Sequence, residues 1–432
     1  MPPYLLDRLG WQQTLLLDTG LREQRAAHLA TAPAPRPTGV REGADWSVHT
    51  AAGSTDLPGE LVRADGDPES GDPAVDEASS GISGALALFG EVYERDSFDG
   101  AGAPVVLTVH YGQDYANAFW DGAQLVFGDG DGEVFGRFTR SPDVLAHELA
   151  HAVTERTAGL VYEGQSGALN ESVSDVFAVC AEQRLLGQTA AEADWLIGSE
   201  LFLPGVQARG LRDMAAPGTA YDDPRLGQDP QPADMAGYVV TSDDNGGVHV
   251  NSGIPNRAFQ LAATAIGGTS WEGAGRIWYA ALTGGLVTER SDFAGFAAAT
   301  VAAAGVHADT VRESWATVGV EPVEGSVGAP LAPAPAPAGE RVVRVRRTGG
   351  FAGRAVEGTA ELDGPDDRAA TLRTLVGRID VGVVRTAALG AARPDHFTYD
   401  FDLGGPRCEV HEQDLTDDLR AVADLVLRPP SV

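Results

Sequence analysis

The chain has few cysteines and no long apolar run. Its two cysteines, Cys180 and Cys408, lie in distant segments, so a framework of disulfide bonds is excluded. We expect both thiols to be inert and partly buried. No uninterrupted apolar stretch approaches the roughly 20 residues that a membrane-spanning helix requires. The sequence therefore predicts a globular protein that does not cross a bilayer.

Basic residues are also scarce. The 432 residues include 62 aspartates and glutamates but only 31 basic side chains, all of them arginine, and the formal net charge is −31. A surface this acidic repels nucleic acid and anionic lipid. We therefore expect neither nucleic acid nor a membrane as a partner, and we expect a monomer.

The N-terminal sequence MPPYLLDRLGWQQ has no basic stretch followed by an apolar core and a small-residue cleavage site. It therefore does not resemble a conventional secretion signal. The expectation from the sequence is a cytoplasmic protein, with export by an unconventional route left open.

Composition and periodicity divide the chain into five segments. A helical-looking piece, Leu5 to Leu29, precedes a proline-rich stretch that neither a helix nor a strand tolerates. Strand and turn signals then change to helical periodicity, and a Pro/Ala spacer precedes a final unit with both kinds of signal. The predicted segments are a leading segment at 1–52, a strand-rich lobe at 53–145, a helical lobe at 146–322, a linker at 323–340 and a small α/β domain at 341–430. These segments predict the α+β fold class.

Local signals place the individual elements. In the strand-rich lobe, PVVLTVHYG and AFWDGAQLVF are typical of strands, and Asp121-Gly122 is typical of a hairpin turn. A helix over 141–159 is expected to begin with Ser141 as N-cap and Pro142 in its first turn. The other expected helices are at 166–187, 256–266, 289–304, 309–318, 368–376 and 416–426, and the last domain has strand signals in RVVRVRR, VGVVRTA and HFTYDFDL.

The stretch VLAHELAHAVTE carries two histidines on one face of the first of these helices. His147 and His151 lie about one turn apart, which suits two ligands of a tetrahedral zinc ion. Glu148 lies beside them, where it can take a proton from a water at the ion, and metalloproteases use the H-E-x-x-H pattern for this reason. The alternative is a helix that carries these residues by chance.

A zinc ion with one position open to water needs a third protein ligand. Glu171, in GALNESVSD on the next expected helix, supplies a carboxylate. Asn170 and Asp175 flank it, and they are well placed to bind the second ring nitrogens of the two histidines and so fix their tautomers. The plainer interpretation of NESVSD is a polar helix start.

Further along, DDNGGVHVNSGIPN brings Asp244 and His249 to a glycine-rich turn that opens onto a helix. A lone histidine after a turn is more often structural or solvated. Here a carboxylate precedes the histidine and can orient and charge its ring, which would make the ring a donor to an oxyanion.

Together, the motifs HELAH, GALNESVSD, NAFWDG and DNGGVHVNSG resemble the thermolysin family of zinc metallopeptidases over residues 57–320. The resemblance implies a two-lobed catalytic fold with one catalytic zinc ion. It implies that His147, His151 and Glu171 hold this ion, and that Glu148 acts as the general base.

The same resemblance assigns groups that contact the substrate. Tyr162 and His249 would stabilise the oxyanion, and Asp244 would orient His249. Asn117 and the backbone of Ala118 would hold the substrate main chain, and Arg212 would bind a carbonyl on the primed side. The implied primed-side specificity pocket is apolar and consists of Phe135, Phe138, Val144, Ile197, Leu201 and Leu211. Cleavage before a hydrophobic residue is therefore implied, and Phe138 favours a smaller one.

The paired calcium site of the family is matched incompletely. Asp143, Glu182 and Asp194 correspond to its acidic positions, but the next expected glutamate is Ser199, which Glu200 follows. Calcium prefers six to eight oxygen ligands, so we expect one calcium ion or none. Ordinary charges on helix surfaces are the alternative.

The run GDGDGE at 128–133 resembles the start of a calcium-binding loop. A twelve-residue loop from this point would end at Arg140 instead of at a bidentate glutamate. We therefore expect a turn at this position.

Both ends of the chain resemble regulatory parts of protealysin-like members of the family. PPYLL, at Pro2 to Leu6, is similar to their short propeptide, which implies a removable segment that covers the active site of a zymogen. The C-terminal unit, with VRVRRTGGFAG and RPDHFTYDF, resembles emfourin, a small protein inhibitor of these peptidases. This implies restraint in cis, because a tether raises the effective concentration toward millimolar. The alternatives are an arbitrary N-terminal helix and a C-terminal accessory domain that binds a substrate or a surface.

The sequence thus predicts a neutral zinc metalloendopeptidase that cleaves peptides or proteins on the N-terminal side of hydrophobic residues and is made as a precursor. The rival hypothesis is a non-catalytic, metal-stabilised binding protein that kept the fold. Degenerate relatives usually lose the base or the oxyanion donors, whereas Glu148, Tyr162 and His249 are all present.

Overall fold

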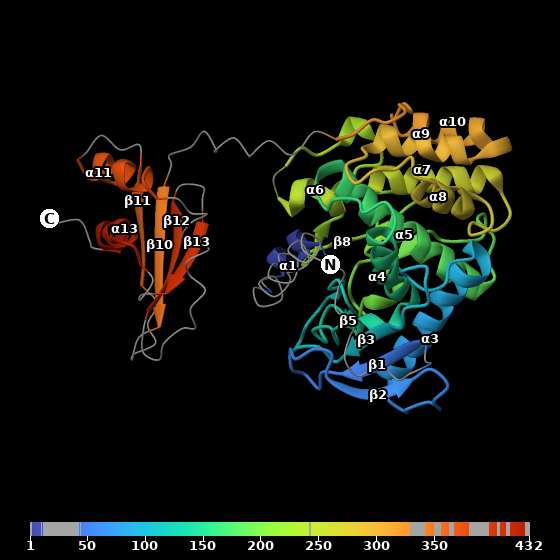
Figure 1. Ribbon diagram of the computed structural model, residues 1–432, viewed down its shortest axis with the longest axis horizontal. Helices are drawn as coiled ribbons and strands as arrows, with labels where there is room; N and C mark the ends of the chain where they lie inside the picture. Colours follow the sequence, from blue (N-terminus) through green and yellow to red (C-terminus); the bar gives the residue numbers. More distant parts are fainter. Residues whose placement is uncertain are drawn as a thin grey trace. The chain divides into compact units, whose positions relative to one another are not determined.

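The chain consists of two compact units, Met1–Leu331 and Ala332–Val432. The computed structural model describes residues 2–9, 11, 43, 45–241, 243–328, 342–349, 356–362, 367–379, 397–403, 407–411 and 415–427. Figure 1 shows the first unit with its main sheet at one end, helices α7 to α10 at the other, and α4 and α5 between them.

The sheet of the first unit has five strands in the order β2-β1-β3-β5-β4. β3 pairs in parallel with both β1 and β5, whereas the edge strands β2 and β4 pair antiparallel with their neighbours. The strands are β1 (Trp46–Thr50), β2 (Glu60–Ala64), β3 (Val105–Val109), β4 (Ala118–Trp120) and β5 (Leu125–Phe127). The expected hairpin is confirmed, since Asp121 Oδ1 accepts the amides of Ala123 and Gln124 in the turn between β4 and β5.

The strand-rich lobe also contains a long helix that the sequence signals did not predict. Helix α3 (Pro73–Ala87) begins at Asp72, whose side chain accepts the amide of Ala74, and continues into the π-helical turn η1 (Leu88–Val92). Its sequence PAVDEASSGISGALA is rich in small residues, which hides the helical period of its apolar side chains. The small residues allow close packing: a Cβ on Gly81 would lie 3.0 Å from Leu145 Cδ1 of α4.

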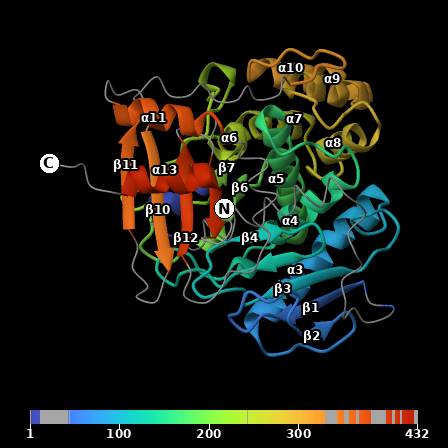
Figure 2. The ribbon, with the colours of Figure 1, turned by 60° about the vertical axis from the view of Figure 1, so that its left-hand side comes forward.

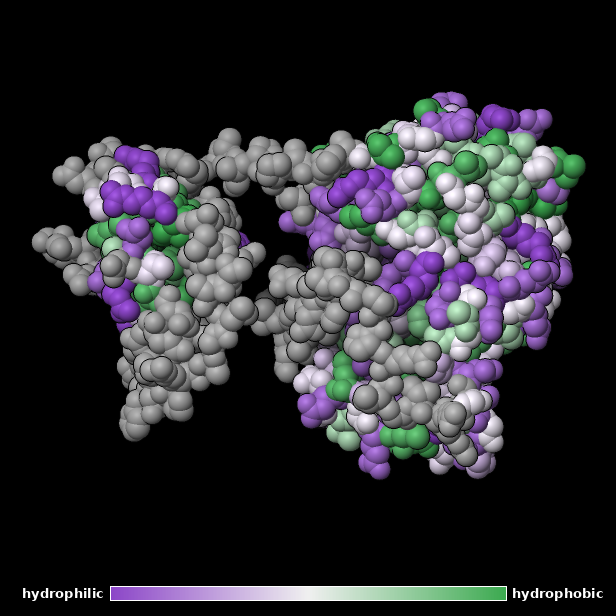
Figure 3. All heavy atoms as spheres, in the orientation of Figure 1, coloured by the Kyte–Doolittle hydropathy of each residue, from purple (hydrophilic) through white to green (hydrophobic). Residues whose placement is uncertain are grey.

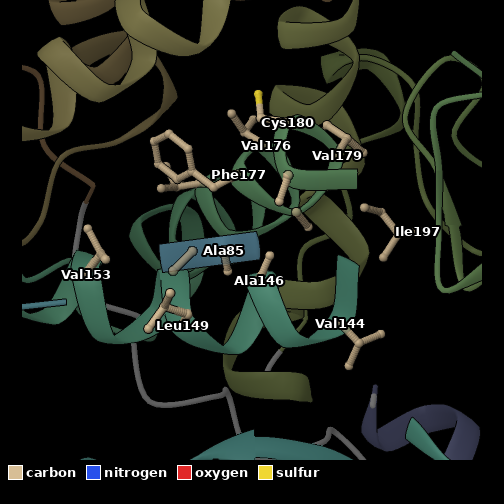
Figure 4. Close-up of a cluster of buried hydrophobic side chains, with 14 of the residues drawn as sticks. Ala85, Val144, Ala146, Leu149, Val153, Val176, Phe177, Val179, Cys180 and Ile197 are labelled. Carbon is tan, nitrogen blue, oxygen red and sulfur yellow. The ribbon is translucent and has the colours of Figure 1, made fainter. Parts of the chain in front are cut away.

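Two buried helices connect the lobes. As expected, α4 (Pro142–Glu155) begins after Ser141 and carries the histidine motif, and α5 (Gly164–Leu186) ends at the left-handed Gly187. The hydroxyl of Ser141 donates to Asp143 Oδ1 instead of capping the helix. Figure 4 shows apolar side chains of α4, such as Leu149 and Val153, in one cluster with those of α5 and with Ala85. This packing holds the two helices rigidly side by side.

The remaining helices cover the other end of the unit. They are α6 (Asp244–Asn251), α7 (Gly253–Ile266), α8 (Ala274–Thr283), α9 (Phe293–Ala303) and α10 (Ala308–Thr317), with short turns η2 (Phe138–Arg140), η3 (Ser199–Leu201), η4 (Met235–Gly237) and η5 (Gly305–His307). The sequence signals predicted α7, α9 and α10 but missed α8. Two short antiparallel ribbons pair β6 (Leu196–Ile197) with β7 (Arg212–Asp213) and β8 (Asp222–Asp223) with β9 (Gly227–Gln228).

The N-terminal helix α1 (Pro3–Arg8) packs on the first unit. Leu5 and Leu6 are fully buried, and the Tyr4 hydroxyl lies 3.1 Å from that of Tyr221. Most of the helix expected over Leu5 to Leu29 lies outside the described residues.

Among its described residues, the C-terminal unit has a four-stranded antiparallel sheet with two helices on one face (Figure 2). Its strands run in the order β11-β10-β12-β13, and alternate residues such as Val343, Val345 and Phe401 enter a core shared with the helices. Its elements are β10 (Val342–Gly349), β11 (Val356–Glu361), α11 (Asp367–Val376), β12 (Phe397–Leu403), β13 (Arg407–His411) and α13 (Asp417–Leu427). The expected strand in VGVVRTA lies outside the described residues.

Hydrophilic and hydrophobic residues are intermixed over the visible face of the first unit in Figure 3. None of the described helices has the length and apolarity that crossing a membrane requires. Cys180 and Cys408 are buried and form no disulfide bond, and burial raises the pKa of the Cys180 thiol to about 12. The Cys180 thiol is therefore a poor nucleophile.

His110, at the end of β3, joins three parts of the strand-rich lobe. Its Nδ1 lies 2.8 Å from Asp129 Oδ2 in the GDGDGE turn, and its Nε2 lies 3.1 Å from Asp72 Oδ2 at the start of α3. The pKa of His110 is raised to about 9, and the hydrogen bond to Asp129 is the largest cause. Burial lowers this pKa, whereas the contact with Asp72 raises it further. At neutral pH, a charged imidazole therefore bridges two carboxylates.

This bridge makes stability depend on pH. Because the folded pKa of about 9 exceeds the unfolded value of roughly 6.5, the stabilisation is complete below pH 6.5 and is lost as the pH rises through 9. We expect His110→Gln to lower the free energy of unfolding at pH 6 and to have little effect at pH 9.5. Urea unfolding at both pH values measures this, with His307→Gln as control. An equal loss at both pH values would contradict the bridge.

Candidate active site

Helices α4 and α5 bring three potential metal ligands together. His147 Nε2 and His151 Nε2 lie 3.1 Å apart, and each lies 3.6 Å from an oxygen of Glu171. All three side chains are buried. Across the described residues, this is the one group of three or more His, Cys, Asp or Glu side chains whose ligand atoms all lie within 4.8 Å of one another.

These spacings fit a zinc ion. Zinc bonds to nitrogen and oxygen of about 2.0–2.1 Å in a tetrahedron place neighbouring ligand atoms roughly 3.3 Å apart. The observed separations of 3.1 and 3.6 Å lie on either side of this value. Two imidazoles and one carboxylate are the donor set of catalytic zinc sites, in which the fourth position belongs to water or substrate.

A buried carboxylate fixes the first histidine. Asp175 Oδ1 lies 2.9 Å from His147 Nδ1, so the ring presents Nε2 to the metal position. Asp175 also accepts two hydrogen bonds from Arg212, at 2.5 and 2.7 Å, and one from the Asn256 amide at 2.7 Å. Burial by itself would raise the pKa of Asp175, but the charges of Arg212 and His147 outweigh it and hold the pKa at about 2. Asp175 is therefore a carboxylate throughout the neutral range.

The second histidine is fixed by neutral groups. His151 Nδ1 lies 2.7 Å from Asn170 Oδ1 and 3.1 Å from the Ser174 hydroxyl. The amide nitrogen of Asn170 in turn donates to the carbonyl of Leu160, which holds the side chain in this orientation. The predicted contacts of Asn170 and Asp175 with the histidines are thus present in the structure. The sequence reasoning missed Ser174 and Asn256, although Ser174 stands within the same NESVSD motif.

Two more predicted side chains converge on Glu171. The Tyr162 hydroxyl donates to Glu171 Oε1 and lies 3.4 Å from His249 Nε2, which is itself 3.6 Å from the same carboxylate oxygen. His249 Nδ1 lies 2.6 Å from Asp244 Oδ1, and the His249 amide donates to Asp244 Oδ2 at 2.8 Å. Both predicted oxyanion donors therefore lie beside the metal position.

An unusual backbone at the start of α6 places Asp244. Four successive residues from Asp244 to Gly247 have positive φ angles, between 50° and 88°. This conformation favours glycine, and at Gly247 a Cβ would also lie 2.8 Å from Asn251 Nδ2. The glycine-rich sequence DDNGG thus lets the chain turn back so that Asp244 reaches the ring five residues later.

The predicted specificity pocket is assembled from several elements. Its members Phe135, Phe138, Val144, Ile197, Leu201 and Leu211 are all buried and belong to one hydrophobic cluster. The β6–β7 ribbon pairs Ile197 with Arg212, which brings the apolar side chain and the buried cation next to each other. Leu5 of the N-terminal helix belongs to the same cluster.

The predicted main-chain binding groups lie at an edge of the sheet. Asn117 immediately precedes β4, which begins with Ala118 and pairs with β5 on one side only. The indole of Trp120 donates to Glu155 at the end of α4, at 2.9 Å, and so ties this edge strand to the helix that carries the histidine motif.

Three of the acidic residues predicted to bind calcium act electrostatically on the fourth, Glu182. Burial raises the pKa of Glu182 to about 9, and the negative charges of Asp143, Asp194 and Glu200 add to the effect. Asp143 already accepts the Ser141 hydroxyl on one oxygen and the Gly198 amide on the other, each at 2.5 Å. A calcium ion here stays a prediction.

Taken together, the buried His-His-Glu group and the glutamate between the two histidines of an H-E-x-x-H helix define a class of enzyme, the zinc metalloendopeptidases. Comparisons with known proteins identify the family. Residues 47–155 match the thermolysin metallopeptidase catalytic domain, and residues 158–320 match its alpha-helical domain. The chain therefore belongs to the thermolysin family, and the predicted two-lobed α+β fold with a catalytic zinc ion is confirmed.

Individual relatives are similar over most of the chain. The chain is 51% identical over 339 residues to an extracellular metalloprotease of Pectobacterium carotovorum, covering 74% of this chain and 96% of that one. It is 48% identical to protease PrtS of a Photorhabdus species, covering 64% and 76%. Its structure resembles the precursor of protealysin from Serratia proteamaculans, with a TM-score of 0.66 and 47% identity, covering 74% and 98%. This similarity to a precursor structure agrees with the prediction that the enzyme is made as a precursor.

The expectation of a cytoplasmic protein is wrong. It rested on the lack of a conventional secretion signal in the first residues. Similar proteins from Pectobacterium carotovorum and Serratia marcescens are named extracellular metalloproteases. The composition of an N-terminal segment therefore does not decide the compartment in this family.

The contact between Asp175 and His147 predicts that the affinity for zinc depends on the Asp175 carboxylate. We expect Asp175→Asn to weaken zinc binding by about 10- to 100-fold, because the ring loses the carboxylate that fixes its tautomer. Competition with a chromophoric chelator measures the dissociation constant. Asp213→Asn is the matched control, since Asp213 binds Arg209 instead of a zinc ligand. Equal zinc affinity of the two variants would show that Asp175 does not support the site.

Proposed function

We propose that the chain is a neutral endopeptidase that cuts peptide bonds on the N-terminal side of hydrophobic residues. The observation that carries this proposal is the convergence of three buried ligands next to a glutamate, two oxyanion donors and an apolar pocket. We assign the zinc ion to His147, His151 and Glu171, whose spacing suits it. Bound there, zinc would activate a water molecule and polarise the scissile carbonyl.

In this proposal, Glu148 is the general base. It lies between the two histidines in α4 and is buried beside them, within reach of a water at the reacting carbonyl. It takes a proton from the attacking water and delivers it to the leaving amine. Asp175 and Asn170 contribute by holding the histidine rings.

Tyr162 and His249 stabilise the negative charge that develops on the carbonyl oxygen. Both side chains can donate a hydrogen bond to such an oxygen, and Asp244 keeps the His249 ring oriented. Because these donors are fixed before the reaction, little reorganisation is needed when charge develops.

The substrate adds to the sheet edge as an extended strand. Its main chain pairs with β4 near Asn117 and Ala118, and its hydrophobic side chain enters the pocket that contains Phe138 and Val144. Arg212 is the candidate for binding a substrate carbonyl, although its Nε and one terminal nitrogen are engaged by Asp175.

We further propose that the part of the predicted segment 1–52 that precedes β1 forms a propeptide that keeps the enzyme latent, because β1 is itself a strand of the catalytic sheet. Leu5 and Leu6 of α1 are fully buried, and burial, followed by the influence of Tyr221, Asp229 and Asp244, raises the pKa of Tyr4 well above its usual value. Helix α1 therefore packs closely on the catalytic domain. Its removal would open the site to substrates.

The C-terminal domain at 341–430 is proposed to restrain the enzyme in cis, joined by the Pro/Ala linker at 323–340. Its resemblance to emfourin supports this, and a tether would keep an inhibitor at an effective concentration near millimolar. We also infer that the mature enzyme acts outside the cell, as the names of its relatives suggest.

Loss of the general base tests the catalytic assignment. We expect Glu148→Ala to reduce casein cleavage by about 10²- to 10⁴-fold while zinc remains bound. A zinc chelator should abolish cleavage by the unchanged chain, and added zinc should restore it. Glu313→Gln, an exposed position in α10, is the control. Cleavage that survives both the substitution and the chelator would reject this mechanism.

Deletion of residues 330–432 tests the restraint. We expect casein turnover to rise severalfold or more, because a tethered inhibitor at near-millimolar effective concentration occupies most of its sites. Initial rates of the shortened and the full chain at equal active-site concentration measure this. An unchanged rate together with lost binding to a surface or substrate would identify an accessory domain instead.

A further inference from the structure

The backbone carbonyl of His249 is held by two side chains. Gln231 Nε2 donates to this carbonyl at 2.7 Å, and the Ser252 hydroxyl donates to it at 3.0 Å. Gln231 Nε2 also donates to the Ser252 hydroxyl at 3.0 Å, so the three groups are linked to one another, and all three residues are buried. Because a carbonyl oxygen only accepts hydrogen bonds, the side-chain amide of Gln231 must present its nitrogen here, which fixes its orientation.

The backbone of Gln231 is rigid. It lies between Pro230 and Pro232, whose rings fix their own φ angles. The amide of Gln231 donates to Asp229 Oδ1 at 3.1 Å, and Asp229 Oδ2 accepts the amide of Gly218 at 3.0 Å. The segment from Asp229 to Pro232 is therefore fastened to a neighbouring loop of the catalytic domain.

The same segment packs closely on the junction between α6 and α7. Ser252 separates the two helices, and α7 begins at Gly253. A Cβ on Gly253 would lie 2.8 Å from the Pro232 carbonyl oxygen and 3.1 Å from Gln231 Cβ, so a side chain cannot be accommodated there. This close contact leaves Gln231 little freedom to move away from His249.

Asp244 and Gln231 hold His249 in different ways. Asp244 binds the ring and the backbone amide, but it lies only five residues before His249, in the same glycine-rich turn. A local contact of this kind orients the ring relative to its own turn. Gln231 lies 18 residues away and connects the His249 backbone to another part of the domain. The position of the imidazole beside the Tyr162 hydroxyl therefore depends on Gln231.

We propose that Gln231 is a positioning residue of the peptidase. By holding the His249 carbonyl, it keeps the imidazole where the substrate carbonyl oxygen gains negative charge. Only 4% of Gln231 is exposed, so it acts through His249 without touching the reacting atoms. This inference rests on the role that the proposed function gives to His249, and it adds a residue that none of the catalytic motifs contains.

The substitution Gln231→Met tests this role, because methionine has a similar length but no donor. Negative charge develops on the substrate oxygen in the transition state, so a displaced donor lowers kcat more than it raises KM. We expect kcat for a quenched fluorescent peptide to fall about 10- to 100-fold, since small displacements of catalytic groups have effects of this size, while KM changes by less than about twofold. An unchanged kcat, or a change confined to KM, would overturn the proposal.

A double-substitution cycle with His249→Ala separates positioning from a general structural effect. Every variant is treated with trypsin, the trypsin is inhibited, and mass spectrometry verifies the loss of the segment that precedes β1. If Gln231 acts through His249, Gln231→Met should lower kcat by less than about twofold in the His249→Ala chain. An equal fall in kcat in both chains would contradict the positioning role.

Two further variants complete the comparison. Gln183→Met removes another buried glutamine, which accepts the Ser270 hydroxyl at 2.6 Å, and kcat should be unchanged. A fall as large as that in Gln231→Met would refute a specific role. Ser252→Ala removes the second donor to the His249 carbonyl, and we expect kcat to fall about threefold. If Gln231→Met does not fold, an unchanged kcat in Ser252→Ala decides against the proposal.

Amide exchange decides the same question without turnover. The His249 amide, which donates to Asp244 Oδ2 at 2.8 Å, is followed in full-length Glu148→Ala, which should not process itself. We expect Gln231→Met to speed its exchange by about threefold to tenfold, the size of one lost hydrogen bond, and to leave the Val105 amide of the main sheet unchanged. Equal exchange of the His249 amide with and without the substitution would reject the contact. If the unchanged chain cleaves no peptide, the peptidase proposal fails, and the exchange rates still decide whether Gln231 holds His249.

Discussion

The carboxylate of Asp175 is the point on which the metal site depends. Its oxygens form hydrogen bonds with His147 of α4, Arg212 of the β6–β7 ribbon and Asn256 of α7, and all of these side chains are buried. A buried carboxylate is costly unless its charge is matched and its oxygens are hydrogen-bonded, and Arg212 does both. One ion pair therefore couples the orientation of a zinc ligand to the packing of three separate elements.

The N-terminal helix α1 packs on the same domain. Leu5 belongs to the hydrophobic cluster that also contains the proposed specificity pocket, and the Tyr4 hydroxyl lies beside that of Tyr221. Apolar burial contributes binding strength without direction. In the proposed precursor, this burial would hold the segment on the domain until it is removed.

Local signals predicted the site better than they predicted the surrounding fold. The H-E-x-x-H spacing implied two ligands on one helix face, and NESVSD supplied the third, since both depend on short-range helix geometry. Helix α3 was missed because its buried face consists of alanine, serine and glycine with few larger apolar side chains, which carry little hydrophobic period. The partners of Asp175 other than His147 could not be paired from the sequence, because they lie 37 and 81 residues away from it.

The sequence by itself determined the donor set, the helices that carry it and the acidic character of the chain, because each follows from composition or from spacing within a few turns. Only the tertiary structure decided that Arg212 is paired with Asp175 and that Tyr162 and His249 meet at Glu171. Such contacts join distant parts of the chain. They depend on how the helices and ribbons pack around a common core, and no local pattern of residues encodes that packing.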